Sequence, residues 1–488
     1  MFKTGFKVFL LFFIVMFLCA NMAQDILKLK NPVNSLDGYF VSAKRDTFSW
    51  SKWFDGSYGE KTNAFLNDSF GFRDLYVRIN NQIRYTLFKK TRVADMIVGK
   101  DDYLFQMGQV MEYNGNLFSG DQAIHDTVVK LQQLRDQLQA LEKKVLVVLA
   151  PNKVRLYPEL MDQRHMHGPV NNCNYEVYKS ALASAGIEFI DFNNWYHLKR
   201  DTSRYDLIPR LGEHWSRLEA VRAADTILKR LSAISGYALP EIKITRIVEK
   251  DTMESPDDDA IRSINVLWYP TYKKMAYPEF EITNKERATK SVLVISDSFW
   301  WDIYMKEIPL TAFKNNEFWY YARDAYGTRL EGKVESSTLD VKRRLLQNDY
   351  LVIVVTEANL SVFGFGFIGR ALNAMLQPIR PTAEEMDAYR AEIMGSKEWY
   401  DHILEDAKLK KISIDSAMNS NINYMFQMHG PTKRLPTVED IILKIKNTPD
   451  WLATVKKQAE ERKISLDSAI RQNAEFVIWD QQKKQKSN

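Results

Sequence analysis

Hydrophobic residues in the middle of the chain follow two alternating patterns. Some form short unbroken runs of Val, Ile and Leu, which are typical of strands buried on both faces of a sheet. These runs cover residues 144–150, 291–296 and 350–355. Others recur at helical spacing, over residues 121–143, 174–185 and 216–235. Because strands that alternate with such helices favour parallel pairing, we predict an α/β fold, a three-layer sandwich with a mostly parallel sheet, over residues 91–378.

The chain begins with a segment typical of export signals. Lys3 and Lys7 precede 13 consecutive apolar residues, 8–20. A run of this length suits the core of a signal peptide, whereas a membrane-spanning helix needs about 20 apolar residues. No Ala-x-Ala cleavage site follows, so we predict that residues 1–24 are either a cleaved signal peptide or a retained signal anchor. Residues 25–90 are rich in aromatic side chains and are expected to pack on the α/β domain.

Residues 379–488 contain an internal repeat with a period of 52. Trp399 aligns with Trp451, and the stretch 411–417 (KISIDSA) aligns with 463–469 (KISLDSA). Each unit is predicted to form two helices joined by a short turn, and the two helical hairpins are expected to stack. Since no catalytic groups gather there, we predict that this helical tail is a packing or docking module.

The composition excludes several classes of protein. The 67 basic and 62 acidic side chains leave a net charge of +5, which is too small in a chain of 488 residues to suggest nucleic-acid binding. Of the two cysteines, Cys19 lies in the hydrophobic N-terminus, so Cys173 stands alone and neither a CxxC metal site nor an intrachain disulfide is expected. No cofactor-binding motif is present, and we expect neither a metal nor a cofactor.

A serine behind one of the predicted strands is the strongest candidate for chemistry. The stretch 296–299 (SDSF) would present Ser298 at the carboxyl edge of the sheet, where α/β folds place their active sites. A serine hydroxyl needs a base to accept its proton, and His214 stands two residues before Ser216, the predicted N-cap of a helix. The alternatives are that the SDSF turn only caps a helix and that His214 is structural.

These residues carry a resemblance to a known family. The SDSF turn resembles the Gly-Asp-Ser nucleophile block of SGNH hydrolases. The histidine precedes the serine, which reverses the usual SGNH order and is similar to the alginate O-acetylation proteins of the AlgX/AlgJ type. Three further segments resemble motifs of that family in the same order: residues 70–73 (FGFR), 98–105 (VGKDDYLF) and 150–159 (APNKVRLYPE). The chain therefore resembles an AlgX/AlgJ-like SGNH hydrolase over roughly residues 45–360.

The resemblance implies an exported serine O-acetyltransferase with an SGNH-like fold. Ser298 would receive an acetyl group and pass it to a hydroxyl of an envelope or extracellular polysaccharide, while His214 acts first as base and then as acid. A membrane-bound O-acyltransferase would supply the acetyl group. The chain would work in the periplasm or another extracytoplasmic space, anchored to the inner membrane through its N-terminal segment.

Two positions depart from the family pattern. The triad aspartate, two residues before the histidine, is Gly212 here, and the glycine of Gly-Asp-Ser is Ser296. Without an orienting carboxylate the imidazole can adopt the wrong tautomer, which costs about 10⁴ in turnover. A Ser–His dyad is one possibility, and a carboxylate from elsewhere is the other. The candidates for such a carboxylate are Glu213, Asp206 and Glu357.

An oxyanion hole needs hydrogen-bond donors near the acyl carbonyl. The backbone amide of Ser298 is one expected donor. Asn152 and Asn359 both follow strand ends and could supply a side-chain amide, although turn formation is the simpler role for each.

Three functions are compatible with the sequence. The first is polysaccharide O-acetyltransfer through an acyl-serine. In the second, the same serine removes acyl groups from an envelope glycan. In the third, the missing aspartate marks a degenerate site, and the chain is a non-catalytic binding or assembly subunit of a polysaccharide-modification complex. Contact between His214 and Ser298 is the geometric condition that both catalytic functions share.

Overall fold

The computed structural model describes most of the chain: residues 2–27, 29–38, 42–168, 172–270, 274–379, 381–429, 442, 445, 446, 449–462 and 464–487. The chain forms two compact units, Met1–Met375 and Leu376–Asn488. Lys463, part of the predicted repeat, lies outside the described residues.

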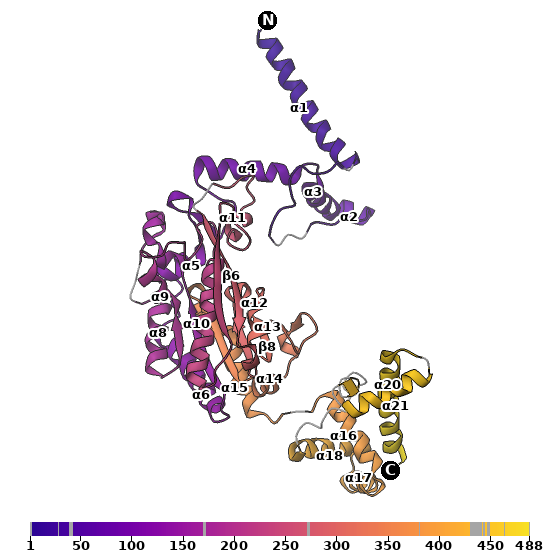
Figure 1. Cartoon of the computed structure of the whole chain (residues 1–488). Helices are drawn as coiled ribbons and strands as arrows, with labels where there is room; N and C mark the ends of the chain where they lie inside the picture. The colour runs from indigo at the N-terminus through magenta and orange to yellow at the C-terminus, as the bar shows by residue number, and fades with distance from the viewer. Residues whose placement is uncertain are drawn as a thin grey trace. The chain divides into compact units, whose positions relative to one another are not determined.

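A seven-stranded sheet runs through the first unit in the order β10-β9-β8-β7-β11-β3-β4 (Figure 1). The strands are β3 (Lys144–Ala150), β4 (Phe189–Asp191), β7 (Ser291–Ser296), β8 (Asn315–Tyr320), β9 (Asp324–Gly327), β10 (Val334–Glu335) and β11 (Tyr350–Thr356). Neighbours from β8 to β4 pair in parallel, whereas β9 and β10 pair antiparallel at one edge, so the sheet is mixed. Every residue of β7 and β11 is buried, which explains their unbroken apolar runs.

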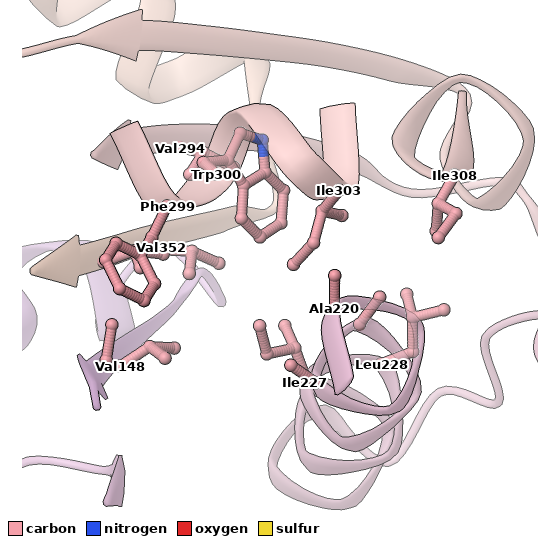
Figure 2. Close-up of a cluster of buried hydrophobic side chains, with 14 of the residues drawn as sticks. Val148, Ala220, Ile227, Leu228, Val294, Phe299, Trp300, Ile303, Ile308 and Val352 are labelled. Carbon is pink, nitrogen blue, oxygen red and sulfur yellow. The ribbon is translucent and has the colours of Figure 1, made fainter. Parts of the chain in front are cut away.

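Helices cover both faces of this sheet. One face packs against α9 (Phe192–Lys199), α10 (Arg217–Ser235), α12 (Trp301–Tyr304) and α13 (Ile308–Ala312). The other packs against α6 (Asp121–Gln139), α8 (Asn174–Ser184), α14 (Val341–Gln347) and α15 (Phe367–Leu376). Alternate strand residues serve the two cores: Val294 of β7 lies in the first and Ile295 in the second. Figure 2 shows part of the first core, where side chains from three strands, α10 and the turn after β7 meet.

Smaller elements frame the sheet. β1 (Met96–Val98) pairs with β2 (Leu104–Gln106), and β5 (Glu241–Lys250) pairs with β6 (Met275–Thr283), both antiparallel. The helix α11 (Asp259–Ser263) lies in the chain between β5 and β6. The remaining short helices are α5 (Met107–Tyr113), α7 (Lys153–Leu156) and the 3₁₀ turns Lys100–Asp102, Pro158–Leu160, Gln163–His165, Lys285–Arg287, Ser298–Trp300, Ser336–Thr338 and Glu357–Gly366.

Among the described residues before the α/β core there are four helices: α1 (Phe2–Leu27), α2 (Trp50–Phe54), α3 (Ser57–Ser69) and α4 (Arg73–Phe88). The C-terminal end of α1 contacts the start of α4, where the hydroxyl of Tyr76 donates to the side-chain oxygen of Asn21 at 2.8 Å. Within the described ranges, the helices include none that combines the length and the apolar character needed to cross a membrane.

The second unit is helical, with α16 (Ala383–Gly395), α17 (Lys397–Lys410), α18 (Ile414–His429), α20 (Pro449–Arg462) and α21 (Leu466–Ser487). Two hydrophobic clusters occupy it, one shared by α16, α17 and α18 and the other by α20 and α21. Five buried residues of the first cluster have counterparts 52 positions later in the second: Ile403, Ala407, Ala417, Met418 and Ile422 match Val455, Ala459, Ala469, Ile470 and Ala474. The sequence period therefore coincides with equivalent core positions.

Candidate active site

Ser298 stands at the carboxyl end of β7, on a turn fixed by the buried carboxylate of Asp297. One oxygen of Asp297 accepts a hydrogen bond from the amide of Phe299 at 3.2 Å. The other accepts from the amide of Thr356 at 2.8 Å and from the side chain of Asn359 at 3.0 Å. Asp297 therefore caps the Ser298–Trp300 turn and also ties it to the end of β11. The alternative that the SDSF turn caps a helix is thus correct, and the capped turn is also what presents Ser298.

His214 is held in a loop that is anchored on three sides. Trp215 is 1% exposed and packs edge-on against Phe299, with ring centroids 5.2 Å apart. Ser216 caps α10, accepting from the amide of Glu219 at 3.3 Å. The side chain of Lys153 holds the residues that precede His214. Packing and capping thus fix the direction in which the imidazole points.

Lys153, from the APNK segment, explains that motif. Its buried ammonium donates to the carbonyls of Pro209, Arg210 and Gly212 at 2.7, 2.8 and 2.8 Å. Three carbonyl acceptors match the three donors of an ammonium group. The lysine therefore holds in place the loop that precedes His214.

The imidazole of His214 joins Ser298 to a carboxylate. Its Nε2 lies 2.8 Å from the Oγ of Ser298, although the two residues are 84 positions apart in the chain. Its Nδ1 lies 2.5 Å from Oδ2 of Asp259, the first residue of α11. The second oxygen of Asp259 accepts from the amides of Glu213 and Ala260 at 2.8 and 2.7 Å. Serine, histidine and aspartate thus form a hydrogen-bonded array with the geometry of a catalytic triad.

The charges of the array support this geometry. Burial by itself would lower the pKa of His214, but the charge of Asp259 and the hydrogen bond to it outweigh burial and raise that pKa above its ordinary value. For Asp259, burial acts to raise the pKa, and the charge of His214 overcomes it and lowers the pKa. The pair therefore favours imidazolium beside carboxylate, which is the state reached once the histidine has taken the proton of a serine.

A second carboxylate also faces His214. Asp302, in α12, is 8% exposed, and burial raises its pKa to about 6 against the opposing charge of His214. Asp302 in turn contributes to raising the pKa of His214. Its Oδ2 is buried and has no hydrogen-bond partner in the part of the chain that the structure describes. Asp302 therefore adds to Asp259 in stabilising positive charge on this imidazole.

The three carboxylates predicted from sequence do not orient His214. Glu357 instead forms a two-point ion pair with Arg155, at 2.8 and 2.6 Å. Glu213 meets Asp259 through its backbone amide, while burial raises the pKa of its carboxyl to about 7. Asp206 lies beside Tyr103 and Tyr157. Burial is the main cause that raises the pKa values of these two tyrosines, and the charge of Asp206 raises them further. The prediction of a Ser–His dyad is also wrong as a description of the geometry, because Asp259 contacts Nδ1 of His214, as the acid of a triad does.

Gly212 shows why the acid comes from another segment. A Cβ atom at Gly212 would lie 2.6 Å from the carbonyl oxygen of Asp257. The segment that delivers Asp259 thus fills the space that a side chain at position 212 would need. The sequence does not single out Asp259, because this residue ends a run of three aspartates in the β5–β6 connection, a pattern typical of a solvated loop. The available signal was Gly212 itself, which called for a carboxylate from elsewhere.

The two asparagines predicted for the oxyanion hole are engaged elsewhere. Asn152 caps α7: its oxygen accepts from the amide of Val154 at 2.8 Å, and its nitrogen donates to the carbonyl of Gln109 at 3.2 Å. The nitrogen of Asn359 donates to Asp297 and to the hydroxyl of Thr356, both at 3.0 Å. Since both hydrogens of that amide have acceptors, Asn359 supports the turn and is not a free donor to an acyl oxygen.

No metal centre adds to this site within the described residues, where histidine, cysteine, aspartate and glutamate nowhere gather in threes suited to an ion. The contacts of Ser298, His214 and Asp259 supply the chemistry of an activated serine: nucleophilic attack assisted by a histidine whose charge is stabilised by Asp259.

Comparisons with known proteins match part of the α/β unit, and the matched range of the family model ends before Ser298. The family model "SGNH hydrolase-like domain, acetyltransferase AlgX" matches residues 96–291, which contain both His214 and Asp259. The probable alginate O-acetylase AlgJ of Pseudomonas syringae pv. tomato is 23% identical over 201 residues, 40% of this chain and 48% of that protein. Its counterpart in Pseudomonas aeruginosa is 25% identical over 179 residues, 37% of this chain and 42% of that protein. The chain thus spans about half the length, or less, of these relatives.

Among solved structures, the O-acetyltransferase domain of Pseudomonas putida AlgJ is similar with a TM-score of 0.37 and 13% identity, covering 57% of this chain and 99% of that domain. The resemblance predicted from the motifs is confirmed by the family model and the two relatives: from β1 to the first residue of β7, this chain is similar to the AlgX/AlgJ-like SGNH hydrolase family.

Proposed function

We propose that this chain is an O-acetyltransferase that carries an acetyl group on Ser298 to a hydroxyl of an envelope or extracellular polysaccharide. The observation that carries the proposal is the array in which His214 lies 2.8 Å from Ser298 and 2.5 Å from Asp259. The names of the relatives, alginate O-acetylases, support the reaction class and a polysaccharide acceptor.

The array accounts for both halves of the reaction. The Oγ of Ser298 attacks the acetyl carbonyl as its proton passes to Nε2 of His214, and the donor's leaving group departs with that proton. This leaves an ester between the acetyl group and Ser298. A sugar hydroxyl then gives its proton to the neutral imidazole and attacks the ester carbonyl. Ser298 leaves and recovers the proton from His214, while Asp259 stabilises the imidazolium in both halves.

Two other functions compete with this proposal. An esterase would use the same residues with water as acceptor, so the ratio of transfer to hydrolysis distinguishes the two. A non-catalytic assembly subunit was suggested by Gly212 alone. Because Asp259 supplies a carboxylate to the imidazole, the absence of an acid at position 212 no longer favours that function.

The cellular setting is part of the same proposal. A membrane-bound O-acyltransferase would deliver the acetyl group, and the N-terminal segment would export the chain and keep it at the inner membrane. The apolar side chains in the first part of α1 are exposed, among them Phe6, Phe9 and Phe12 at 65–67%. An alkaline phosphatase fused after residue 375 should be active only if this segment exports the chain. An inactive fusion that is present at normal levels would contradict export.

The reaction is tested with the full chain, p-nitrophenyl acetate as donor and alginate oligosaccharides as acceptor. We expect mass spectrometry to find an acetyl group on Ser298 and on the oligosaccharide, with both absent in Ser298→Ala. That substitution should cost on the order of 10⁶ in turnover. A Ser298→Ala variant that still acetylates the acceptor, or a wild-type chain that never acquires an acetyl group on Ser298, would contradict the proposal.

A further inference from the structure

A cavity of about 560 Å³ lies beside the helix that carries the catalytic acid. Residues between 32 and 37 form one wall, residues 266–269 form the other, and Arg78 of α4 and Arg262 of α11 line it between them. The helices α4 and α11 lie close together in Figure 1, where Asn81 of α4 donates to the carbonyl of Ile264 at 2.8 Å. The volume is in the range of cavities that bind small molecules.

Buried polar side chains of α4 hold both walls in place. The guanidinium of Arg78 donates to the carbonyls of Ser35 and Val266, both at 3.0 Å. The side-chain oxygen of Gln82 accepts from the amide of Trp268 at 3.1 Å. Arg78 and Gln82 are 8% and 5% exposed. Because buried polar groups fix the backbone on each side, the shape of the cavity is set by the fold.

A further pair of hydrogen bonds joins the two walls. The amide of Asp37 donates to the side-chain oxygen of Asn265 at 2.7 Å, and the side-chain nitrogen of Asn265 donates to the carbonyl of Asp37 at 3.0 Å. This exchange fixes the backbone of Asp37, whose carboxylate is left to line the cavity.

Trp268 exposes its indole at this cavity although its backbone is fixed. The residue is 63% exposed, and its neighbour Tyr269 is 39% exposed. Tryptophan is highly buried on average, so an indole held at the surface of a cavity is unusual. The face of an indole carries partial negative charge and attracts polarised C–H groups. One face of a pyranose ring presents such C–H groups, so a sugar can stack there.

The polar groups beside Trp268 match the edge of a sugar ring. Nη2 of Arg262 donates to the hydroxyl of Ser255 at 3.0 Å, and Nε lies 3.2 Å from the carboxylate of Asp258. Nη1 has no hydrogen-bond partner in the part of the chain that the structure describes, which leaves a donor for a ligand. The side chain of Asp37 is 45% exposed and offers carboxylate oxygens to a hydroxyl. A donor and an acceptor therefore flank the aromatic face.

The same short helix serves the cavity and the catalytic array. Asp259, its first residue, contacts His214, and Arg262 follows three positions later. Residues three apart on a helix are neighbours, with about 5–6 Å between their Cβ atoms. The wall of the cavity and the acid of the array are thus one helical turn apart, a separation that a polymer of a few sugar units can cover.

We propose that this cavity binds a pyranose unit of the acceptor polysaccharide, a few units along from the hydroxyl that is acetylated. This assignment rests on the proposed function and deepens it, because it locates where the acceptor is held. Trp268 stacks on the C–H face of the ring, Arg262 donates to an oxygen on its edge, and Asp37 accepts from a hydroxyl. A long acceptor contacts the cavity and the array together, whereas a disaccharide reaches only one of them.

The test compares Trp268→Ala with Trp50→Ala, a matched control that removes an indole 67% exposed on α2, outside the cavity. Calorimetry without an acetyl donor measures the Kd of the full chain for an alginate hexasaccharide. Trp268→Ala should weaken binding about tenfold through lost stacking and burial. Trp50→Ala should bind as the wild type does, and Trp268→Phe, which keeps an aromatic face, should lose much less than Trp268→Ala.

A second variant leaves the indole in place. Asp37→Asn removes a charged acceptor from the cavity and should weaken binding about threefold. Thermal unfolding shows whether each variant is folded. Equal Kd values for Trp268→Ala and Trp50→Ala, or a wild-type chain that does not bind the hexasaccharide, would overturn the inference.

Kinetics separate a role in holding the acceptor from an effect on the array. In transfer from p-nitrophenyl acetate, Trp268→Ala should raise KM for the hexasaccharide about tenfold with little change in kcat. The KM for an alginate disaccharide and the rate at which Ser298 acquires its acetyl group should not change. An equal loss with the disaccharide would overturn the inference. A wild-type chain that binds the hexasaccharide through Trp268 but never acetylates Ser298 would instead contradict the proposed function.

Discussion

The nucleophile turn and the acid-bearing connection reach the same imidazole in very different ways. Ser298 follows a buried strand directly, so its place at the edge of the sheet follows from the position of β7. Asp259 lies on a short helix between β5 and β6, outside the seven-stranded sheet. The first residue is presented by the central sheet and the second by a peripheral connection. Groups that reach one imidazole can thus come from the central sheet and from a connection outside it.

Removing the acid should cost the site the most activity. Asp259→Asn should keep the shape of the site but lower turnover on the order of 10⁴-fold, because the amide no longer selects the correct tautomer of His214. Asp258→Asn is the matched control, since the neighbouring carboxylate pairs with Arg262 at 3.2 Å. Turnover is measured with p-nitrophenyl acetate. Equal activities of the two variants would remove Asp259 from the array.

Placing an aspartate at position 212 instead of position 259 tests whether the space at Gly212 can hold a side chain. Gly212→Asp places a Cβ against the carbonyl of Asp257 at 2.6 Å, a backbone contact that cannot yield by a side-chain movement. We expect this variant to lose activity at least about tenfold and stability by about 1–3 kcal/mol, as for overpacked sites, in denaturant unfolding. Adding Gly212→Asp to Asp259→Asn should not restore turnover. Full recovery in the double variant would show that the two positions are interchangeable.

The second carboxylate beside His214 should have the smallest effect. Asp302→Asn removes one of the charges that raise the pKa of His214, so that pKa should fall and activity should begin at lower pH. We expect a shift of roughly one pH unit or less, since Asp259 remains. The pH profile of kcat/KM measures it. A shift toward higher pH would contradict the placement of Asp302.

The raised pKa of His214 also predicts how the free energy of unfolding changes with pH. The pKa of His214 is higher in the folded chain than in the unfolded one, so pairing with Asp259 stabilises the fold fully below the unfolded pKa, about 6.5. This contribution is lost as the pH rises through the folded pKa. Asp259→Asn should therefore destabilise the chain more at pH 6 than in alkaline solution, where the two unfolding free energies converge.

Much of the fold could be predicted from the sequence. The three long buried strands and the helices between them follow from unbroken and periodic apolar patterns, and Ser298 follows from its place behind β7. Short strands gave no such signal: β9 and β10 contribute only four and two residues, and their antiparallel pairing makes the sheet mixed. The three predicted acids failed for a related reason, because proximity along the chain or to a strand end does not decide which carboxylate reaches an imidazole.

By itself, the sequence determined the three long buried strands, the capped helix after His214 and the serine turn, since each depends on contacts within a few residues or on a local hydrophobic pattern. The tertiary structure alone decided which acid pairs with His214. Asp259 reaches the imidazole from a segment 45 residues away along the chain. Hydrogen bonds between such distant groups depend on how whole segments pack, and no local pattern records that packing.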